Sequence, residues 1–175
     1  GKFLYTIEFY PEEGKYHLDG HRDCQFVCTP EETKRHDGLC PKCKRPLTIG
    51  VMNRVNELAD RTEEAARALS RISYRSMVPL PEIIADVLQV GVASKAVGAL
   101  YAKFISKLGN EFHILLKSTV PELATVDSTV AEAIQRVRQG KMTITPGYDG
   151  VFGVVKVFVD AVRPWKPTQT SLNIE

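Results

Sequence analysis

The chain opens with a run of β-branched and aromatic residues and later acquires a helical period. Residues 3–10 read FLYTIEFY and end at Pro11, a composition that predicts a strand. From residue 51 onward, apolar residues recur at three- and four-residue steps, so we expect one long helix through about residue 72. The apolar positions of this predicted helix are Val51, Val55, Leu58, Leu69 and Ile72.

Further helices are predicted after the two prolines of residues 79–81. Pro81 suits the first turn of a helix that runs to about Gln89. Ser94 is placed to cap a second helix, which ends before Gly109. Asp127 is placed to cap a third, which ends before Gly140. The core-facing stripe of the second helix is Val97, Leu100, Tyr101, Phe104, Ile105 and Leu108. Residues 111–117 fit either a short helix or a strand.

The period changes again near the C-terminus. Residues 141–145 alternate, residues 146–150 (PGYDG) have turn chemistry, and residues 151–159 are rich in β-formers, which predicts a β-hairpin. We therefore expect an α+β fold, in which a small four-cysteine zinc module precedes a mainly helical domain and a C-terminal β-hairpin. The expected domains are a strand and zinc module (1–50), a helical domain (51–140), a hairpin packed on the helices (141–160) and a flexible tail (161–175).

Composition and charge change this picture little. Hydrophobic residues make up 43% of the chain and charged residues 25%, as in ordinary globular proteins. No apolar run approaches the roughly 20 residues of a membrane span. The formal net charge of +2 is a weak argument for any partner, so only local charge clusters point to nucleic acid. The chain begins Gly-Lys-Phe rather than with Met, and we expect a fragment or a processed chain.

All four cysteines lie in one stretch, as two close pairs. Cys24 and Cys28 form a C-x3-C pair, and Cys40 and Cys43 form a C-x2-C pair. Four thiolates satisfy the tetrahedral preference of Zn²⁺ and leave no open position, which predicts a structural zinc. Two disulfides or an iron–sulfur cluster are the alternatives. Disulfides require an oxidising compartment, and no secretory segment is visible.

A His/Asp cluster precedes the cysteines. Residues 15–23 contain His17, Asp19, His21 and Asp23, and we interpret them as a polar hairpin that leads into the zinc loop. In that interpretation His21 or Asp23 supports the sulfur ligands from outside the metal shell. The alternative is a separate metal or acid–base site that uses His17, Asp19 and His21.

Two groups of basic residues are candidates for phosphate contact. The zinc loop carries Lys34, Arg35, Lys42, Lys44 and Arg45, and the predicted long helix places Arg67, Arg71 and Arg75 on one face. In both places a solvated surface is the alternative. Tyr148, between two glycines of the predicted turn, either stacks on a base or covers an edge of the core.

Several separated motifs, in this order, resemble the C-terminal part of the endonuclease Q family. They are residues 16–22 (YHLDGHR), the two cysteine pairs, 47–50 (LTIG), 57–61 (ELADR), 78–84 (VPLPEII) and 146–150 (PGYDG). The resemblance covers most of residues 5–160. It implies a DNA repair protein that joins an N-terminal PHP metal-dependent nuclease domain to a zinc module and a helical region. Such proteins cut DNA 5′ to deaminated bases such as uracil and hypoxanthine, and at abasic sites.

The resemblance also implies that Cys24, Cys28, Cys40 and Cys43 bind zinc, that DNA is the partner, and that the protein is cytoplasmic and nucleoid-associated. The PHP domain with its metal ligands is absent from this chain, so we expect no catalytic residue here and no DNA cleavage by the chain alone. The tail residues Gln169, Leu172 and Ile174 are similar to a sliding-clamp-binding peptide. The alternative function is a zinc-stabilised scaffold that docks a nuclease domain or a clamp without binding DNA.

Overall fold

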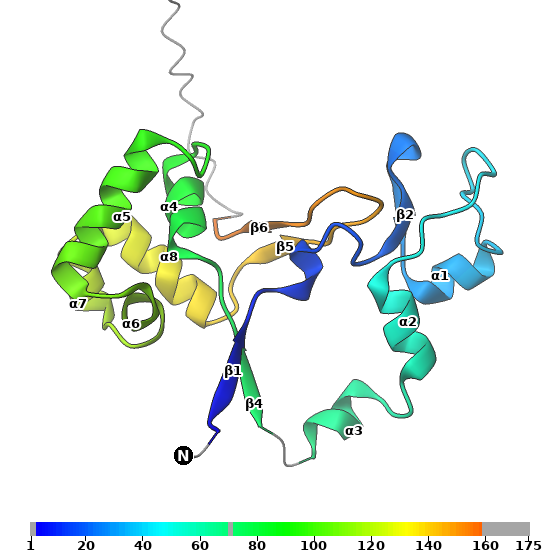
Figure 1. Cartoon of the computed structure of the whole chain (residues 1–175), viewed down its shortest axis with the longest axis horizontal. Coiled ribbons are helices and arrows are strands. Elements are labelled where there is room, and N and C mark those ends of the chain that lie inside the picture. The colour runs from blue at the N-terminus through cyan, green and yellow to red at the C-terminus, as the bar shows by residue number, and fades with distance from the viewer. Residues whose placement is uncertain (1–2, 70–71, 159–175) are drawn as a thin grey trace, which may run out of the picture.

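The computed structural model describes residues 3–69 and 72–158 of the chain, so Arg71 and the tail residues Gln169, Leu172 and Ile174 lie outside the described residues. The strands are β1 (Tyr5–Glu8), β2 (Asp19–His21), β3 (Phe26–Cys28), β4 (Ser73–Ser76), β5 (Thr143–Thr145) and β6 (Val154–Lys156). The helices are α1 (Pro30–Arg35), α2 (Val51–Leu58), α3 (Glu63–Arg67), α4 (Leu80–Leu88), α5 (Lys95–Leu108), α6 (Glu111–Leu116), α7 (Val120–Ala124) and α8 (Ser128–Arg138). Two 3-10 turns, η1 (Pro11–Glu13) and η2 (Arg22–Cys24), complete the elements (Figure 1).

Helices α4 to α8 pack around the main hydrophobic core (Figure 1). The predicted caps are confirmed, because Ser94 Oγ accepts from the N–H of Val97 and the Asp127 carboxylate accepts from the first N–H groups of α8. Residues 111–116 are helical, which resolves the open choice between helix and strand. The largest fully buried side chains of this core are Phe104, Leu80, Ile83, Ile84, Ile114, Leu123, Ile134, Val97, Val130 and Val157.

The predicted C-terminal hairpin is confirmed, with strands shorter than the sequence pattern indicated. Strands β5 and β6 pair antiparallel, with Thr143 opposite Lys156. The hairpin is fastened to α4 through Asp86, whose carboxylate accepts from the N–H of Val157 at 2.9 Å and pairs with Lys156 Nζ at 3.1 Å. The α+β fold with a C-terminal hairpin is therefore as expected. None of the helices in the described part of the chain combines the length and apolarity of a membrane span.

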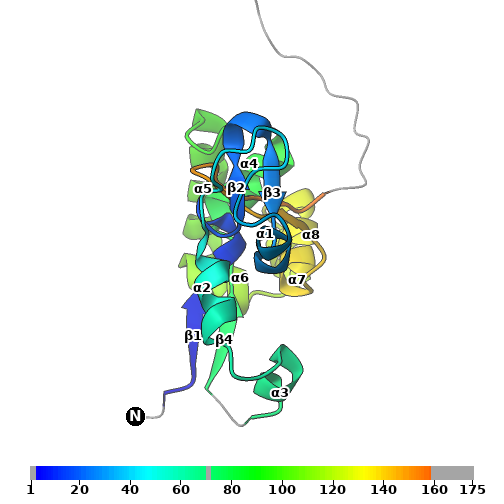
Figure 2. The ribbon, with the colours of Figure 1, turned by 90° about the vertical axis from the view of Figure 1, so that its right-hand side faces the viewer.

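The prediction of one helix from residue 51 to about residue 72 is wrong. Helix α2 ends at Leu58, and the extended backbone of Ala59 separates it from α3, which Thr62 caps through the N–H of Ala65. The chain then forms β4, which pairs in parallel with β1 (Figure 2). The helical period did not reveal this break, because β4 is set by pairing with a strand far away in the sequence.

The shared arginine face expected on that helix does not exist. Arg67 ends α3 and bonds Glu63 at 3.1 Å, whereas Arg75 lies in β4 with its guanidinium 4.6 Å from the centre of the Tyr5 ring. Arg61 also lies outside any helix, and it pairs with Asp60. A phosphate-tracking stripe along one helix is thus excluded for Arg67 and Arg75.

Candidate metal centre

The first pair of metal-ligating side chains comes from the β2–β3 hairpin. Its register places Asp19 opposite Cys28 and His21 opposite Phe26. Turn η2 connects the strands, and Gln25 closes the turn with a left-handed backbone (φ 48°). Because η2 is a single tight turn, His21 at its start and Cys24 at its end are held close together.

The second pair comes from a tight turn after α1. The N–H of Lys44 donates to the carbonyl of Cys40 at 2.8 Å, and the N–H of Cys40 donates to the carbonyl of Arg45 at 2.8 Å. Lys44 has a left-handed backbone, with φ of 62°. This turn presents Cys40 and Cys43 on one side, facing the η2 turn.

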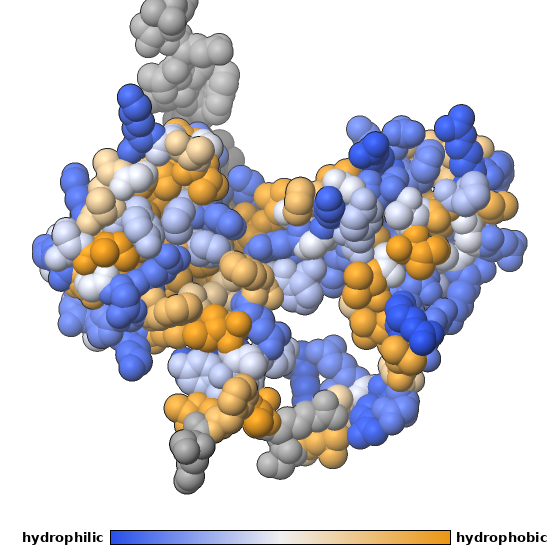
Figure 3. Space-filling view, viewed as in Figure 1, coloured by the Kyte–Doolittle hydropathy of each residue, from blue (hydrophilic) through white to orange (hydrophobic). Residues whose placement is uncertain are grey.

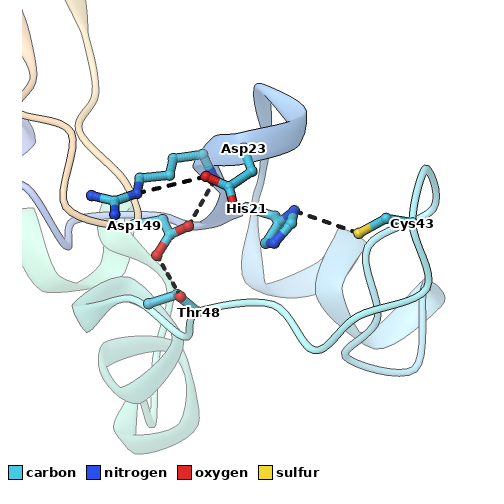
Figure 4. A network of polar contacts seen from close by, with 6 residues as sticks. His21, Asp23, Cys43, Thr48 and Asp149 are labelled. Atoms are coloured by element: carbon cyan, nitrogen blue, oxygen red, sulfur yellow. Dashed lines mark hydrogen bonds and ion pairs between the residues drawn. The ribbon is translucent and has the colours of Figure 1, made fainter.

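Four ligand atoms meet between these turns. They belong to His21, Cys24, Cys40 and Cys43 and lie within 4.8 Å of one another. His21 Nδ1 and Cys43 Sγ are 3.5 Å apart (Figure 4). A tetrahedron with Zn–S bonds of about 2.3 Å has edges of about 3.8 Å, so the spacing fits a closed zinc site. Three sulfurs and one imidazole are also a ligand set that zinc prefers.

The structure therefore brings three of the four predicted cysteines together, and the fourth position of the group is taken by His21. The sequence contained a signal for this set. His21 and Cys24 form an H-x2-C pair, which matches the C-x2-C spacing of Cys40 and Cys43. Cys24 and Cys28, as a C-x3-C pair, do not match that spacing.

The thiol of Cys28 points to a different partner. Cys28 is buried, and its Sγ lies 3.2 Å from Thr33 Oγ1. The single hydroxyl hydrogen of Thr33 is already donated to the Asp19 carboxylate at 2.5 Å, so Cys28 must donate its S–H. Burial raises the pKa of Cys28, the hydrogen bond with Thr33 opposes that shift, and the negative charge of Asp19 adds to it.

Cys24 and Cys40 differ in acidity. A hydrogen bond with Cys43 is the main cause that raises the pKa of Cys24 to about 11, with burial as the second cause. For Cys40, burial opposes ionisation, but the N–H groups of Cys43 and Lys42 donate to its sulfur and lower its pKa to about 7. Cys40, which is fully buried, is thus more readily a thiolate than Cys24.

Asp19 has a structural role and does not belong to a second site. Its buried carboxylate accepts from Thr33, from the N–H of Gly50 at 2.6 Å and from Asn53 Nδ2 at 2.6 Å. These bonds join the hairpin to α1 and α2. Within the described residues, His21, Cys24, Cys40 and Cys43 are the only group of three or more such side chains that could hold a metal.

The loop after β5 fastens the metal module to the rest of the molecule. Asp149 accepts from the N–H of Arg22 at 2.7 Å and from Thr48 Oγ1 at 2.6 Å (Figure 4). The Tyr148 ring lies against Gly20, where an added Cβ would come within 2.4 Å of a ring carbon. This placement favours the structural alternative for Tyr148 over base stacking.

The predicted basic residues of the module are all exposed. Lys42 Nζ donates to the Cys24 carbonyl at 2.7 Å, and Arg35 lies 3.9 Å from Glu32. In the described part of the chain, Lys34, Lys44 and Arg45 form no ion pair and are available to an anionic partner. The five exposed residues are Lys34, Arg35, Lys42, Lys44 and Arg45.

Comparison with known proteins gives a consistent result. Residues 79–141 match the family model described as the MJ0043 C-terminal domain. The crystal structure of the lesion-specific endonuclease PfuEndoQ from Pyrococcus furiosus superposes with a TM-score of 0.77 at 35% identity, over 87% of this chain and 38% of that one. The chain is a partial, C-terminal endonuclease Q-like region.

A second solved structure supports the same assignment. Endonuclease Q in complex with a 27-mer duplex substrate, which has an abasic lesion at the active site, matches with a TM-score of 0.74 and 33% identity. That match covers 90% of this chain and 40% of the endonuclease Q chain. The "Uncharacterized protein MJ0043" of Methanocaldococcus jannaschii is 37% identical over 163 residues, which are 93% of this chain and 20% of that protein. The chain therefore spans less than half of each of these relatives.

Proposed function

We propose that this endonuclease Q-like chain is the DNA-binding and substrate-positioning region of a DNA repair endonuclease that cleaves 5′ to deaminated bases. Cleavage itself belongs to a PHP nuclease domain of the same parent protein, and this chain contributes no catalytic residue. The observation that supports the proposal is the match to an endonuclease Q structure that holds a damaged DNA duplex.

Zinc is the proposed metal, held by Cys24, Cys40, Cys43 and His21. When bound, it cross-links the η2 turn to the turn at residues 40–44 and carries out no chemistry on the substrate, because all four positions are occupied by protein. The basic residues Lys34, Lys44 and Arg45 extend from this cross-linked module and contact phosphates. Removing a base from the duplex stack costs a few kcal/mol, and such contacts contribute to that energy.

The other partners are proposals of the same kind. Gln169, Leu172 and Ile174 are proposed to bind a sliding clamp, which would bring the protein to DNA in the nucleoid. Removal of residues 161–175 should abolish binding to a purified clamp and leave DNA binding by the zinc module unchanged.

The test of DNA binding is a titration with a fluorescent duplex that contains one deoxyuridine, at 50 and 200 mM salt. The charge reversal Lys44→Glu/Arg45→Glu should weaken binding at least tenfold and reduce the salt slope by about 2, since each lost phosphate contact removes about 0.9 from the slope. The matched control Lys95→Glu/Lys103→Glu makes the same change in net charge at two exposed lysines on α5. No binding at low salt, or equal losses in both variants, would refute the proposal.

A protein-interaction scaffold remains the second candidate, and a specific observation favours it. Large apolar side chains are exposed along residues 49–74 and in β1. Charge reversal separates the two functions, because a scaffold that does not touch DNA is indifferent to Lys44→Glu/Arg45→Glu.

A further inference from the structure

The loop that joins β5 to β6 is fastened to the chain segment before β2. The N–H of Gly147 donates to the carbonyl of Glu12 at 2.8 Å. The N–H of Gly150 donates to the carbonyl of Lys15 at 2.9 Å. The two backbones approach so closely that a Cβ added to Gly147 would lie 2.4 Å from the carbonyl oxygen of Gly14. Side chains on these two segments are therefore presented by a fixed backbone.

Two exposed aromatic rings flank one lysine on this surface. Tyr16, before β2, is 46% exposed, and Phe152, in the β5–β6 loop, is 67% exposed. Lys15 Nζ lies 5.5 Å from the centre of the Tyr16 ring and 5.7 Å from the centre of the Phe152 ring. Figure 3 shows hydrophobic and hydrophilic side chains together at the surface between the helices and the metal module, where this loop lies in Figure 1. We call Lys15, Tyr16 and Phe152 the aromatic platform.

Lys15 and Arg22 supply positive charge at the aromatic platform. Within the described residues, Lys15 forms no ion pair. The Arg22 side chain is 62% exposed and lies 4.0 Å from the exposed carboxylate of Asp23, a surface pair that contributes little. A Cβ added to Gly150 would lie 3.4 Å from Arg22 Nη1 and 3.9 Å from the Tyr16 hydroxyl, so both groups reach the loop. Exposed rings beside free cations suit a nucleotide, whose base stacks while its phosphate meets the charge.

The groove on which Phe152 borders differs in charge from the aromatic platform. It has a volume of about 950 Å³, and Glu13, Glu82 and Asp86 are among the residues that line it. These carboxylates repel a phosphate. A nucleic-acid strand is therefore expected to run past Lys15 rather than along the groove.

The aromatic platform is suited to stack on a base rather than to identify it. Enzymes read a base that has left the duplex in a snug pocket, through hydrogen bonds to its edge. Tyr16 and Phe152 are exposed instead, and stacking on an exposed ring tolerates any base because every base has a π-face. The ligand that fits is a base that has lost its pairing partner, whatever its identity.

We propose that the aromatic platform stacks on the base left unpaired when the lesion opposite it is taken out of the duplex, while Lys15 and Arg22 contact the adjoining phosphate. Removal of one base from the stack leaves its former partner without a hydrogen-bonding edge to pair with. Stacking that partner on Phe152 offsets part of the unstacking energy. This proposal rests on the proposed function for DNA as the ligand, but it uses side chains outside the group Lys34, Lys44 and Arg45.

The test uses the 175-residue chain and two end-labelled duplexes of the same length and charge. The first contains an abasic site opposite adenine, and the second contains abasic sites at both positions. Only the first offers an unpaired base, and neither contains a damaged base. The chain should bind the first duplex about fivefold to a hundredfold more tightly, the range expected for one base stacked on an aromatic side chain.

Phe152→Ala should lower this ratio of affinities to about one and leave the affinity for the second duplex unchanged. The matched control Phe112→Ala removes a phenylalanine that is 57% exposed on α6, and it should keep the full ratio. Lys15→Ala should weaken binding to both duplexes and reduce the salt slope by about 0.9, because it removes one phosphate contact. All three side chains are exposed, so each variant should keep the melting temperature of the unaltered chain.

Equal affinity of the unaltered chain for the two duplexes, or a full ratio in Phe152→Ala, would overturn the proposal. Failure of the zinc module to contact DNA gives a different result, since Lys44→Glu/Arg45→Glu would then bind both duplexes as the unaltered chain does and the ratio that depends on Phe152 would persist. If only the zinc module contacts DNA, the charge reversal weakens binding to both duplexes, and the two affinities are equal. A chain that binds neither duplex would refute both proposals.

Discussion

Replacing Cys28 and Cys43 by alanine, one at a time, tests which side chains hold the metal. Each substitution removes one thiol, and both residues lie in the stretch between residues 24 and 43. The structure places Cys43 Sγ in the group of four ligand atoms, whereas Cys28 Sγ bonds Thr33. We therefore expect Cys28→Ala to keep its zinc affinity and Cys43→Ala to bind zinc more weakly.

The magnitudes follow from the contacts. Cys28→Ala removes one hydrogen bond, worth about 1 kcal/mol, and a buried atom of similar worth, so the loss of unfolding free energy is about 2 kcal/mol. No buried group is left unsatisfied, because the Thr33 hydroxyl still donates to Asp19. Structural zinc contributes roughly 10–16 kcal/mol in small modules, or about 3 kcal/mol for each of four ligands. Loss of His21 or Cys43 should thus weaken zinc binding by about two orders of magnitude.

The assay is zinc content by mass spectrometry, followed by competition with a chromogenic chelator. His21→Ala completes the set and should behave like Cys43→Ala. A zinc affinity of Cys28→Ala as low as that of Cys43→Ala, with the affinity of His21→Ala unchanged, would refute this assignment of the ligands. That result would establish the four-cysteine site that the sequence predicted.

Three further predictions concern one residue beside the metal module and two in the helical unit. Burial opposes ionisation of Asp149, but hydrogen bonds from Thr48 and from the N–H of Arg22 lower its pKa. The ionised carboxylate therefore stabilises the fold at neutral pH, and this stabilisation is lost as the pH falls through the lowered pKa. Asp149→Asn should therefore lower the melting temperature at pH 7 and flatten its decline in acid. Arg138 donates to the carbonyls of Ile114, Leu115 and Ser118, and Arg138→Ala should cost about 3 kcal/mol in urea unfolding, since buried carbonyls lose their donor. Burial raises the pKa of Glu82. The charged carboxylate therefore destabilises the fold once the pH rises through that pKa. Glu82→Gln should raise the melting temperature at pH 7 and have no effect at pH 3.

The sequence alone determined the features that depend on neighbouring residues. Among the helices that follow Pro79, α4, α5 and α8 were predicted. The caps of α5 and α8 were predicted with them, because Ser94 and Asp127 satisfy N–H groups only two or three positions away. The hairpin of β5 and β6 was predicted for the same reason, since alternation and turn chemistry lie within one short segment. Local spacing also indicated Cys24, Cys40 and Cys43 as members of one group that could hold a metal.

Only the tertiary structure decided the features that depend on distant partners. The helical period of residues 51–72 correctly predicted α2. Beyond α3, however, the chain forms β4, which pairs with β1. No local pattern reveals a strand partner some 70 residues away. The role of Cys28 was decided likewise, because its thiol hydrogen bonds into a network with Thr33 and Asp19 while His21 turns toward Cys43. Spacing indicates which side chains can reach a metal. Which of them do so depends on the directions that the folded backbone imposes.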